Sequence, residues 1–139
     1  MRIKEIMSPE VECLDPTATI LDAAQIMREC NVGSLPVMAG DRLVGILTDR
    51  DIVCRLVAEG LDGETTLVDT IMTREVATCL DNDDVEVAIH LMEDRKIRRL
   101  AVLDHDTSRM IGMLSLGDLS ATLPHDIAGE VMDRVSVHH

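Results

Sequence analysis

A hydroxyl residue is followed three positions later by an aspartate at two places in the chain. Each copy comes directly after an apolar stretch, in the sequences GILTDRD and GMLSLGD. The two pairs are Thr48 with Asp51 and Ser115 with Asp118. At this spacing the hydroxyl accepts a hydrogen bond from the third helical amide, and the acid reaches back to the amide of the cap. The pattern therefore predicts a strand that runs into a capped helix.

The same atoms also suit a nucleotide. A helix N-terminus offers backbone amides and the positive end of the helix dipole to a phosphate. A carboxylate one turn into the helix can accept two charge-assisted hydrogen bonds from a ribose diol. Gly45 and Gly112, in the preceding strands, allow another backbone to approach closely. The cap and the ligand site are compatible predictions, because an unliganded site can cap its own helix.

Both copies belong to an internal repeat that covers most of the chain. Residues 6–11 read IMSPEV, and residues 71–76 read IMTREV. The offset between the copies increases by two residues before Gly112, in a polar loop where insertions cost little. We predict repeat 1 over residues 1–60, a linker over 61–66, repeat 2 over 67–123 and a C-terminal helical segment over 124–139.

Apolar periodicity predicts the order β-α-β-β-α in each repeat, an α/β (α+β) fold. Thr19 and Asp84 are the expected caps of the first helices. The apolar faces of these helices are Ile20, Ala23, Ala24 and Met27, then Val85, Ala88, Ile89 and Met92. The expected strands are 11–14, 35–38, 43–47, 76–80, 100–103 and 110–114, and the second helices are 49–58 and 116–122.

A half of this length is marginally stable alone, so we expect the two repeats to pack with pseudo-two-fold symmetry. Beyond them, Ile127, Val131 and Val135 recur every four residues. This spacing predicts a C-terminal helix that packs on the body of the protein or on a partner. His138 and His139 read as a tag remnant and carry no prediction.

Composition excludes several classes of function. The net charge of −13 argues against binding nucleic acid or an anionic membrane surface. No apolar leader or membrane span is present, so we expect a cytoplasmic protein. No nucleophile set and no metal-ligand spacing emerge, so we expect neither an enzyme nor a metal site. The cysteines Cys13, Cys30, Cys54 and Cys79 are predicted to be buried thiols, with a disulfide from Cys13 or Cys30 as the alternative.

The ordered motifs resemble those of a CBS-domain pair, also called a Bateman module. The matching motifs are IMSPEV and IMTREV, then VGSLPV and IRRLAV, then GILTDRD and GMLSLGD. The resemblance covers about residues 3–123. The chain looks like the small stand-alone CBS-pair proteins of bacteria and archaea. The resemblance implies a regulatory module without catalysis, no obligatory cofactor, assembly as a homodimer and an unidentified protein partner. It also implies two clefts between the repeats that bind AMP, ADP or ATP, or else NAD or S-adenosylmethionine.

The resemblance assigns roles to individual residues. The acids Asp51 and Asp118 hold a ribose, and Thr48 and Ser115 hold a phosphate. The adenine lies against aliphatic side chains, since the chain has no Phe, Tyr or Trp to stack on it. By this analogy the adenine pockets are Val11, Cys13, Leu35 and Pro36 for one repeat, and Val76, Thr78, Leu100 and Ala101 for the other.

The phosphate side differs between the repeats. Repeat 2 has Arg98 and Arg99, where repeat 1 has Gly33 and Ser34. Arginine suits phosphate because its planar fork donates two parallel hydrogen bonds, and Arg50 is a further candidate. The missing arginines of repeat 1 favour an alternative function, a structural or interaction module that dimerises and has vestigial ligand clefts. Ala101, where the family has proline, and Gly117, which weakens a first helical turn, set repeat 2 apart.

Overall fold

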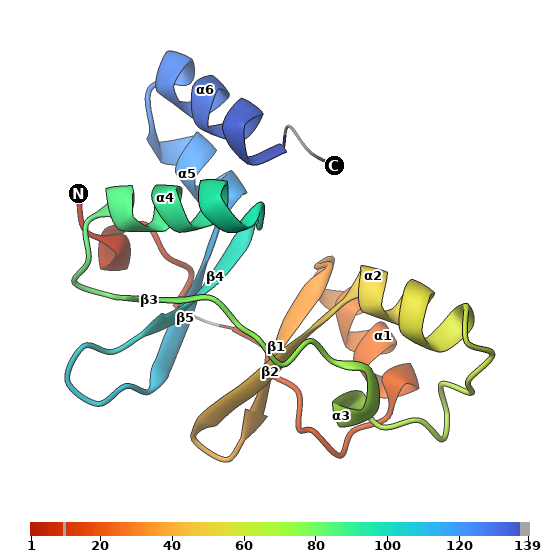
Figure 1. The fold of residues 1–139 in the computed structure, drawn as a ribbon. Coiled ribbons are helices and arrows are strands. Elements are labelled where there is room, and N and C mark those ends of the chain that lie inside the picture. The colour runs from red at the N-terminus through yellow and green to blue at the C-terminus, as the bar shows by residue number, and fades with distance from the viewer. Residues whose placement is uncertain (10, 137–139) are drawn as a thin grey trace. The chain divides into compact units, whose positions relative to one another are not determined.

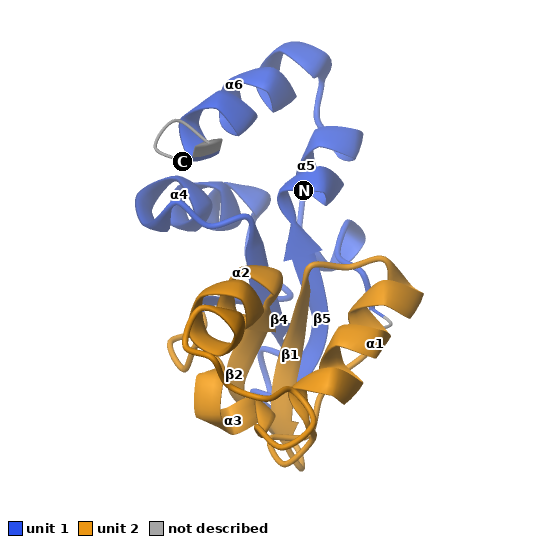
Figure 2. Ribbon diagram, turned by 90° about the vertical axis from the view of Figure 1, so that its right-hand side faces the viewer, with its two compact units in different colours: residues 1–11, 77–139 blue, residues 12–76 orange. Residues whose placement is uncertain are grey.

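The computed structural model describes residues 1–9 and 11–136. The chain forms two compact units, drawn in different colours in Figure 2. Unit 2 is Glu12–Val76, and unit 1 combines Met1–Val11 with Ala77–His139. Each unit has a hydrophobic core of its own. The first residues of each predicted repeat therefore fold with the other repeat: Met1–Val11 belong to unit 1, and residues 67–76 belong to unit 2.

Unit 2 is built on the hairpin of β1 (Ser34–Ala39) and β2 (Arg42–Thr48). Helix α1 (Ile20–Cys30) precedes the hairpin, and Thr19 caps it by accepting a hydrogen bond from the Asp22 amide. Ile20, Ala23 and Met27 of this helix are buried, as their spacing predicts. The unit is completed by α2 (Asp49–Asp51), η2 (Ile52–Val57) and α3 (Val68–Ile71), which are labelled or traceable by colour in Figure 1.

Unit 1 repeats this plan. Strands β3 (Thr78–Leu80), β4 (Arg99–Leu103) and β5 (Met110–Ser115) form a sheet, in which β3 is parallel to β4 and β4 is antiparallel to β5. Asp84 caps α4 (Val85–Arg95) as predicted, and α5 (Leu116–Thr122) matches its expected bounds. The mixed α/β fold with tandem repeats is confirmed. The short helices η1 (Ile3–Glu5) and α3 were not expected.

Two predicted elements of repeat 1 differ from the structure. The strand expected over 11–14 is reduced to a single parallel bridge from Leu14 to Val37. Glu12 and Cys13 are both exposed, so buried and exposed side chains do not alternate before Leu14. After Leu14, Pro16 has no amide to donate to a neighbouring strand. The helix expected over 49–58 is α-helical only to Asp51 and continues as a π-helix, in which the Ala58 amide bonds the Val53 carbonyl at 2.9 Å.

In each unit a segment from outside the hairpin forms an antiparallel bridge with the second hairpin strand, beside a glycine. We call this contact the crossing. In unit 2, Thr73 and Ile46 exchange backbone hydrogen bonds of 2.8 and 2.9 Å; in unit 1, Ser8 and Met113 do the same at 2.8 and 3.0 Å. A Cβ at Gly45 would lie 2.9 Å from the Thr73 carbonyl oxygen, and one at Gly112 would lie 2.7 Å from that of Ser8. The expected close approach of another backbone is thus confirmed at both glycines.

The C-terminal helix α6 (His125–Ser136) packs on α4 and α5 of unit 1, as Figure 1 shows. Val131 and Val135 are buried as predicted, but the third buried position is Ala128, because Ile127 is 43% exposed. The last predicted helical residue, Val137, lies outside the described residues. Neither α6 nor another helix of the described chain is long and apolar enough to cross a bilayer.

The prediction of buried cysteines is wrong for three of the four. Cys13, Cys30 and Cys54 are exposed, and only Cys79 is buried, with a pKa raised by desolvation to about 12. The spacing of thiols does not reveal exposure, since Cys30 and Cys54 lie on the outer faces of their helices. Among the described cysteines no disulfide forms.

The crossing beside Gly45 gives the first testable prediction. We expect Gly45→Ala to destabilise the fold by about 1–3 kcal/mol, because the new methyl group must push back the Thr73 carbonyl and Met72. Gly129→Ala is the matched control: its Cβ meets nothing within 4 Å inside α6, so we expect a gain of about 0.5–1 kcal/mol. Urea unfolding of both variants measures the change in the free energy of unfolding. Equal changes in the two variants would contradict the close contact at Gly45.

A second prediction comes from His105, whose Nδ1 lies 2.9 Å from the Asp81 Oδ1 atom. This hydrogen bond raises the pKa of His105 above 6.5 and lowers the pKa of Asp81 below 3.8. The histidine stabilises the fold fully below its unfolded pKa and loses this effect as pH rises through the folded value. The aspartate contributes above its unfolded pKa and loses this effect as pH falls through its lowered folded pKa.

The pair is therefore most stabilising between about pH 4 and 6.5. We expect the difference in melting temperature between the wild type and His105→Ala to be greatest near pH 5 and to shrink towards pH 8. His90→Ala, which removes an exposed histidine of the same unit, is the control. A difference that is constant over this range would refute the role given to the pair.

Candidate functional site

Both predicted capping boxes are formed. In unit 2 the Asp51 amide donates to Thr48 Oγ1 at 3.0 Å, and the Thr48 amide donates to Asp51 Oδ2 at 3.0 Å. In unit 1 the corresponding bonds between Ser115 and Asp118 are 3.0 and 2.9 Å. Each hydroxyl and acid thus stands where the second hairpin strand turns into a helix. The two units present the same pair of groups at the same point of the fold.

The helix amides are less available than the sequence suggests. In unit 2 the Asp49 amide donates to the Gly33 carbonyl at 2.9 Å, and the Arg50 amide donates to Asp49 Oδ1 at 2.9 Å. Together with the Asp51 amide, the first three helical amides all have acceptors within the protein. A phosphate at this turn must therefore be bound by side chains or must displace one of these acceptors.

The Asp51 carboxylate is almost enclosed, with 7% of the residue exposed. Thr73 Oγ1 lies 3.1 Å from Oδ1 and 3.3 Å from Oδ2 of this carboxylate, and Arg55 Nε lies 3.8 Å from Oδ1. Sequence reasoning missed both partners. The hydroxyl repeated in IMS and IMT, and the i,i+4 spacing of Asp51 and Arg55, are the signals that could have identified them.

The sheet register places one of the predicted arginines at the site of its own unit. Arg99 is paired with Ser115 across β4 and β5, and the equivalent pair in unit 2 is Ser34 with Thr48. Arg98 and Arg99 are both exposed, and the Arg98 carbonyl accepts the Leu116 amide at 2.8 Å. Arg99 therefore lies beside Ser115 in the sheet, and Arg98 directly precedes the strand. In unit 2, Arg50 is exposed on α2, directly before Asp51.

The residues of the predicted adenine pockets are divided differently from the sequence assignment. Val11 belongs to unit 1 and Val76 to unit 2, so each folds apart from the other members of its set. Leu35 and Leu100 lie inside the two cores. Pro36 and Ala101 are also buried, whereas Cys13 and Thr78 are exposed and Val11 and Val76 are half-buried.

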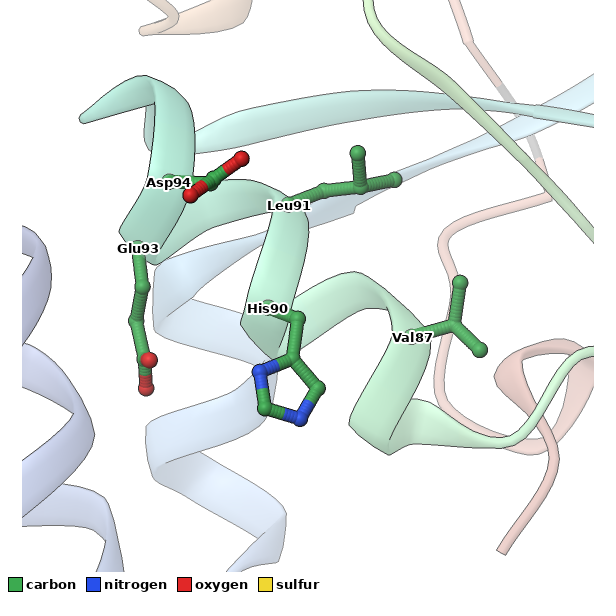
Figure 3. Close-up of a pocket in the computed structure, with 5 residues that line it drawn as sticks. All are labelled: Val87, His90, Leu91, Glu93 and Asp94. Atoms are coloured by element: carbon green, nitrogen blue, oxygen red, sulfur yellow. The ribbon is translucent and has the colours of Figure 1, made fainter.

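Two other features of unit 1 stand apart from these residues. Figure 3 shows an open hollow along α4, lined by Val87, His90, Leu91, Glu93 and Asp94. Glu93 is already engaged there, since its Oε1 atom lies 3.0 Å from Arg134 Nη1 of α6. None of the predicted site residues lines this hollow.

The loop between β4 and β5 carries the other feature. Asp104, His105 and Asp106 could each offer one ligand atom within 4.8 Å of the others. His105 already pairs with Asp81, and exposed acidic groups of this kind are common without a metal ion. The expectation of no metal site stays a prediction.

The tandem repeats and their duplicated hydroxyl and acid pairs define a two-repeat α/β fold, and comparison with known proteins identifies it. The family model for the CBS domain matches residues 3–58 and 68–125. The CBS domain-containing protein YhcV of Bacillus subtilis is 36% identical over 135 residues, which are 96% of this chain and 94% of that protein. The chain belongs to the CBS-domain family.

Two solved structures show the same fold. The crystal structure of Hypoxic Response Protein I, with two coordinated zinc ions, has a TM-score of 0.80 and 33% identity, over 89% of this chain and 100% of that one. The CBS domain protein PAE2072 of Pyrobaculum aerophilum, complexed with AMP, has a TM-score of 0.78 and 30% identity, over 95% of this chain and 98% of that one. Some members of the family therefore bind an adenosine nucleotide.

Proposed function

We propose that this protein is a regulatory module that binds an adenosine-containing nucleotide and does not catalyse a reaction. AMP, ADP and ATP are the proposed ligands, with NAD and S-adenosylmethionine as further candidates. The observation that carries the proposal is the duplicated site: each unit holds a hydroxyl and a carboxylate at the same strand-to-helix turn. The AMP complex of a relative that is 30% identical supports the choice of ligand.

The proposed roles follow from the chemistry of each group. The carboxylates of Asp51 and Asp118 accept hydrogen bonds from the ribose diol, and Thr48 and Ser115 donate to a phosphate oxygen. Arg99, across the sheet from Ser115, donates to the phosphate in unit 1 together with Arg98, and Arg50 does so in unit 2.

The adenine contacts stay a prediction. Cys13, Thr78, Val11 and Val76 have exposed or half-exposed surface that an adenine ring can cover. Leu35, Leu100, Pro36 and Ala101 are buried, so we assign them the supporting layer beneath that surface. The chain has no aromatic residue, so the affinity for adenine comes from burial against aliphatic side chains rather than from stacking.

Calorimetric titration with AMP tests the proposal. We expect Asp51→Asn and Asp118→Asn each to weaken one class of site by about tenfold or more, because a charged acceptor of the ribose diol is lost. The amide oxygen of asparagine still accepts the cap hydrogen bond, so the fold should survive. Titrations with ATP, NAD and S-adenosylmethionine then rank the ligands.

Asp49→Asn is the matched control, since it removes the same charge from the same helical turn without touching the capping box. AMP affinity should be unchanged in this variant. Absence of binding by every one of these ligands at millimolar concentration would refute the proposed function. Binding that survives the double substitution of Asp51 and Asp118 would refute the site.

A homodimer is the second part of the proposal, and η2 supplies the observation that favours it. Val53 and Val57 are 59% and 67% exposed, one turn apart on this π-helix. Large apolar side chains that adjoin on a surface are typical of interfaces. The same contact would serve the alternative function, a structural or interaction module with vestigial sites, which differs only in lacking ligand binding.

We expect the double variant Val53→Asp and Val57→Asp to shift the protein to a monomer in sedimentation velocity, because buried carboxylates would meet at the contact. Met132→Asp, at an exposed position of α6, is the control and should remain dimeric. Dissociation by Met132→Asp alone would place the contact on the C-terminal helix instead. Cytoplasmic location and the absence of catalysis stay predictions from the sequence.

A further inference from the structure

The two candidate sites are not equivalent, because only one carboxylate has an additional side-chain donor. Among the described residues, Asp118 receives the Ser115 amide and no side-chain hydrogen bond to its carboxylate, whereas Asp51 also receives the Thr73 hydroxyl. The residue equivalent to Thr73 in the repeat is Ser8. The residue equivalent to Arg55 is Thr122, whose hydroxyl donates to the Asp118 backbone carbonyl instead.

The position of Thr73 is set by the backbone. Its amide and carbonyl both bond to Ile46 in β2, which fixes the backbone from which the hydroxyl reaches Asp51. Arg55 also binds this segment, because its Nη1 atom donates to the carbonyls of Ile71 and Met72 at 3.2 and 3.3 Å. Arg55 lies in the π-helix, a rare conformation often found at functional sites.

The Thr73 hydroxyl spans both oxygens of the Asp51 carboxylate. Its Oγ1 atom lies 3.1 Å from Oδ1 and 3.3 Å from Oδ2, so its single proton is shared between them. A diol that binds both oxygens needs the space in front of both of them. The Thr73 oxygen occupies that space, and only 7% of Asp51 is exposed.

We propose that Thr73 is a positioning residue that competes with the ribose diol for Asp51 and so sets the nucleotide preference of the unit 2 site. This inference rests on the proposed function. A single ribose hydroxyl can share the carboxylate with Thr73, but a complete diol displaces it. Occupancy by a diol thereby breaks the hydrogen bond from Thr73 to Asp51, next to the segment that Arg55 binds.

The test compares AMP with 2′-deoxy-AMP, which lacks one hydroxyl of the diol, in the Asp118→Asn background. We expect Thr73→Val to bind AMP about tenfold more tightly than the parent, because the competing donor to a charged group is gone. Its affinity for 2′-deoxy-AMP should change by less than about threefold. Thr73→Ser, which restores the hydroxyl, should return both affinities to those of the parent.

Thermal unfolding first establishes that each variant is folded, and Thr73→Ala serves if valine is not tolerated. Ser8→Ala in the Asp51→Asn background is the matched control, and it should leave AMP affinity unchanged. The competition is overturned if the variants without the hydroxyl bind AMP equally or more weakly than the parent. It is also overturned if their affinities for AMP and 2′-deoxy-AMP change in parallel. Either result leaves the proposed function standing. Failure of AMP to bind any folded form overturns both.

Discussion

The crossing of a backbone segment beside a glycine is the contact on which the rest of each unit depends. Gly45 and Gly112 have no Cβ, and the segments at Thr73 and Ser8 occupy the space that a Cβ would fill. Two backbone hydrogen bonds fasten each crossing to the second hairpin strand. Because each segment lies at the start of the other repeat in sequence, neither repeat can complete its sheet from its own residues. Each compact unit therefore draws on residues of both repeats.

The same crossing accounts for the state of the Asp51 carboxylate. A carboxylate that is removed from water must be hydrogen-bonded or paired with a charge, and Asp51 has two donors and a nearby arginine for this reason. Asp118 is only half-buried and lacks this support, but it lies at the turn that faces Arg99 across the sheet. The repeats have thus kept one framework while the polar partners of the two carboxylates differ.

The C-terminal helix makes the units unequal in a second way. Ala128, Val131 and Val135 enter the core of unit 1, and Arg134 forms an ion pair with Glu93 of α4 at 3.0 Å. In unit 2 the helical surface that contains Val53 and Val57 remains exposed to solvent. Burial of apolar area is the main source of stability in folding and association, so α6 stabilises unit 1 in a way that no described helix does for unit 2.

Local spacing alone determined much of this protein. The repeat, the helix caps at Thr19 and Asp84, and both capping boxes could be read directly, because a cap depends only on residues three positions apart. The apolar faces of the first helices follow from the helical period in the same way. The order of these motifs also sufficed to indicate the CBS family.

Tertiary structure alone decided which segments pair over long distances. The exchange of the first residues of each repeat, and the contact of Thr73 with Asp51 across 22 positions, have no local period that would reveal them. The rotation of α6 that buries Ala128 rather than Ile127 was set by the surfaces of α4 and α5, since both residues fit a helical stripe. Such contacts depend on which sheet edge or helix face remains uncovered once the local elements have formed, and that is a property of the folded chain.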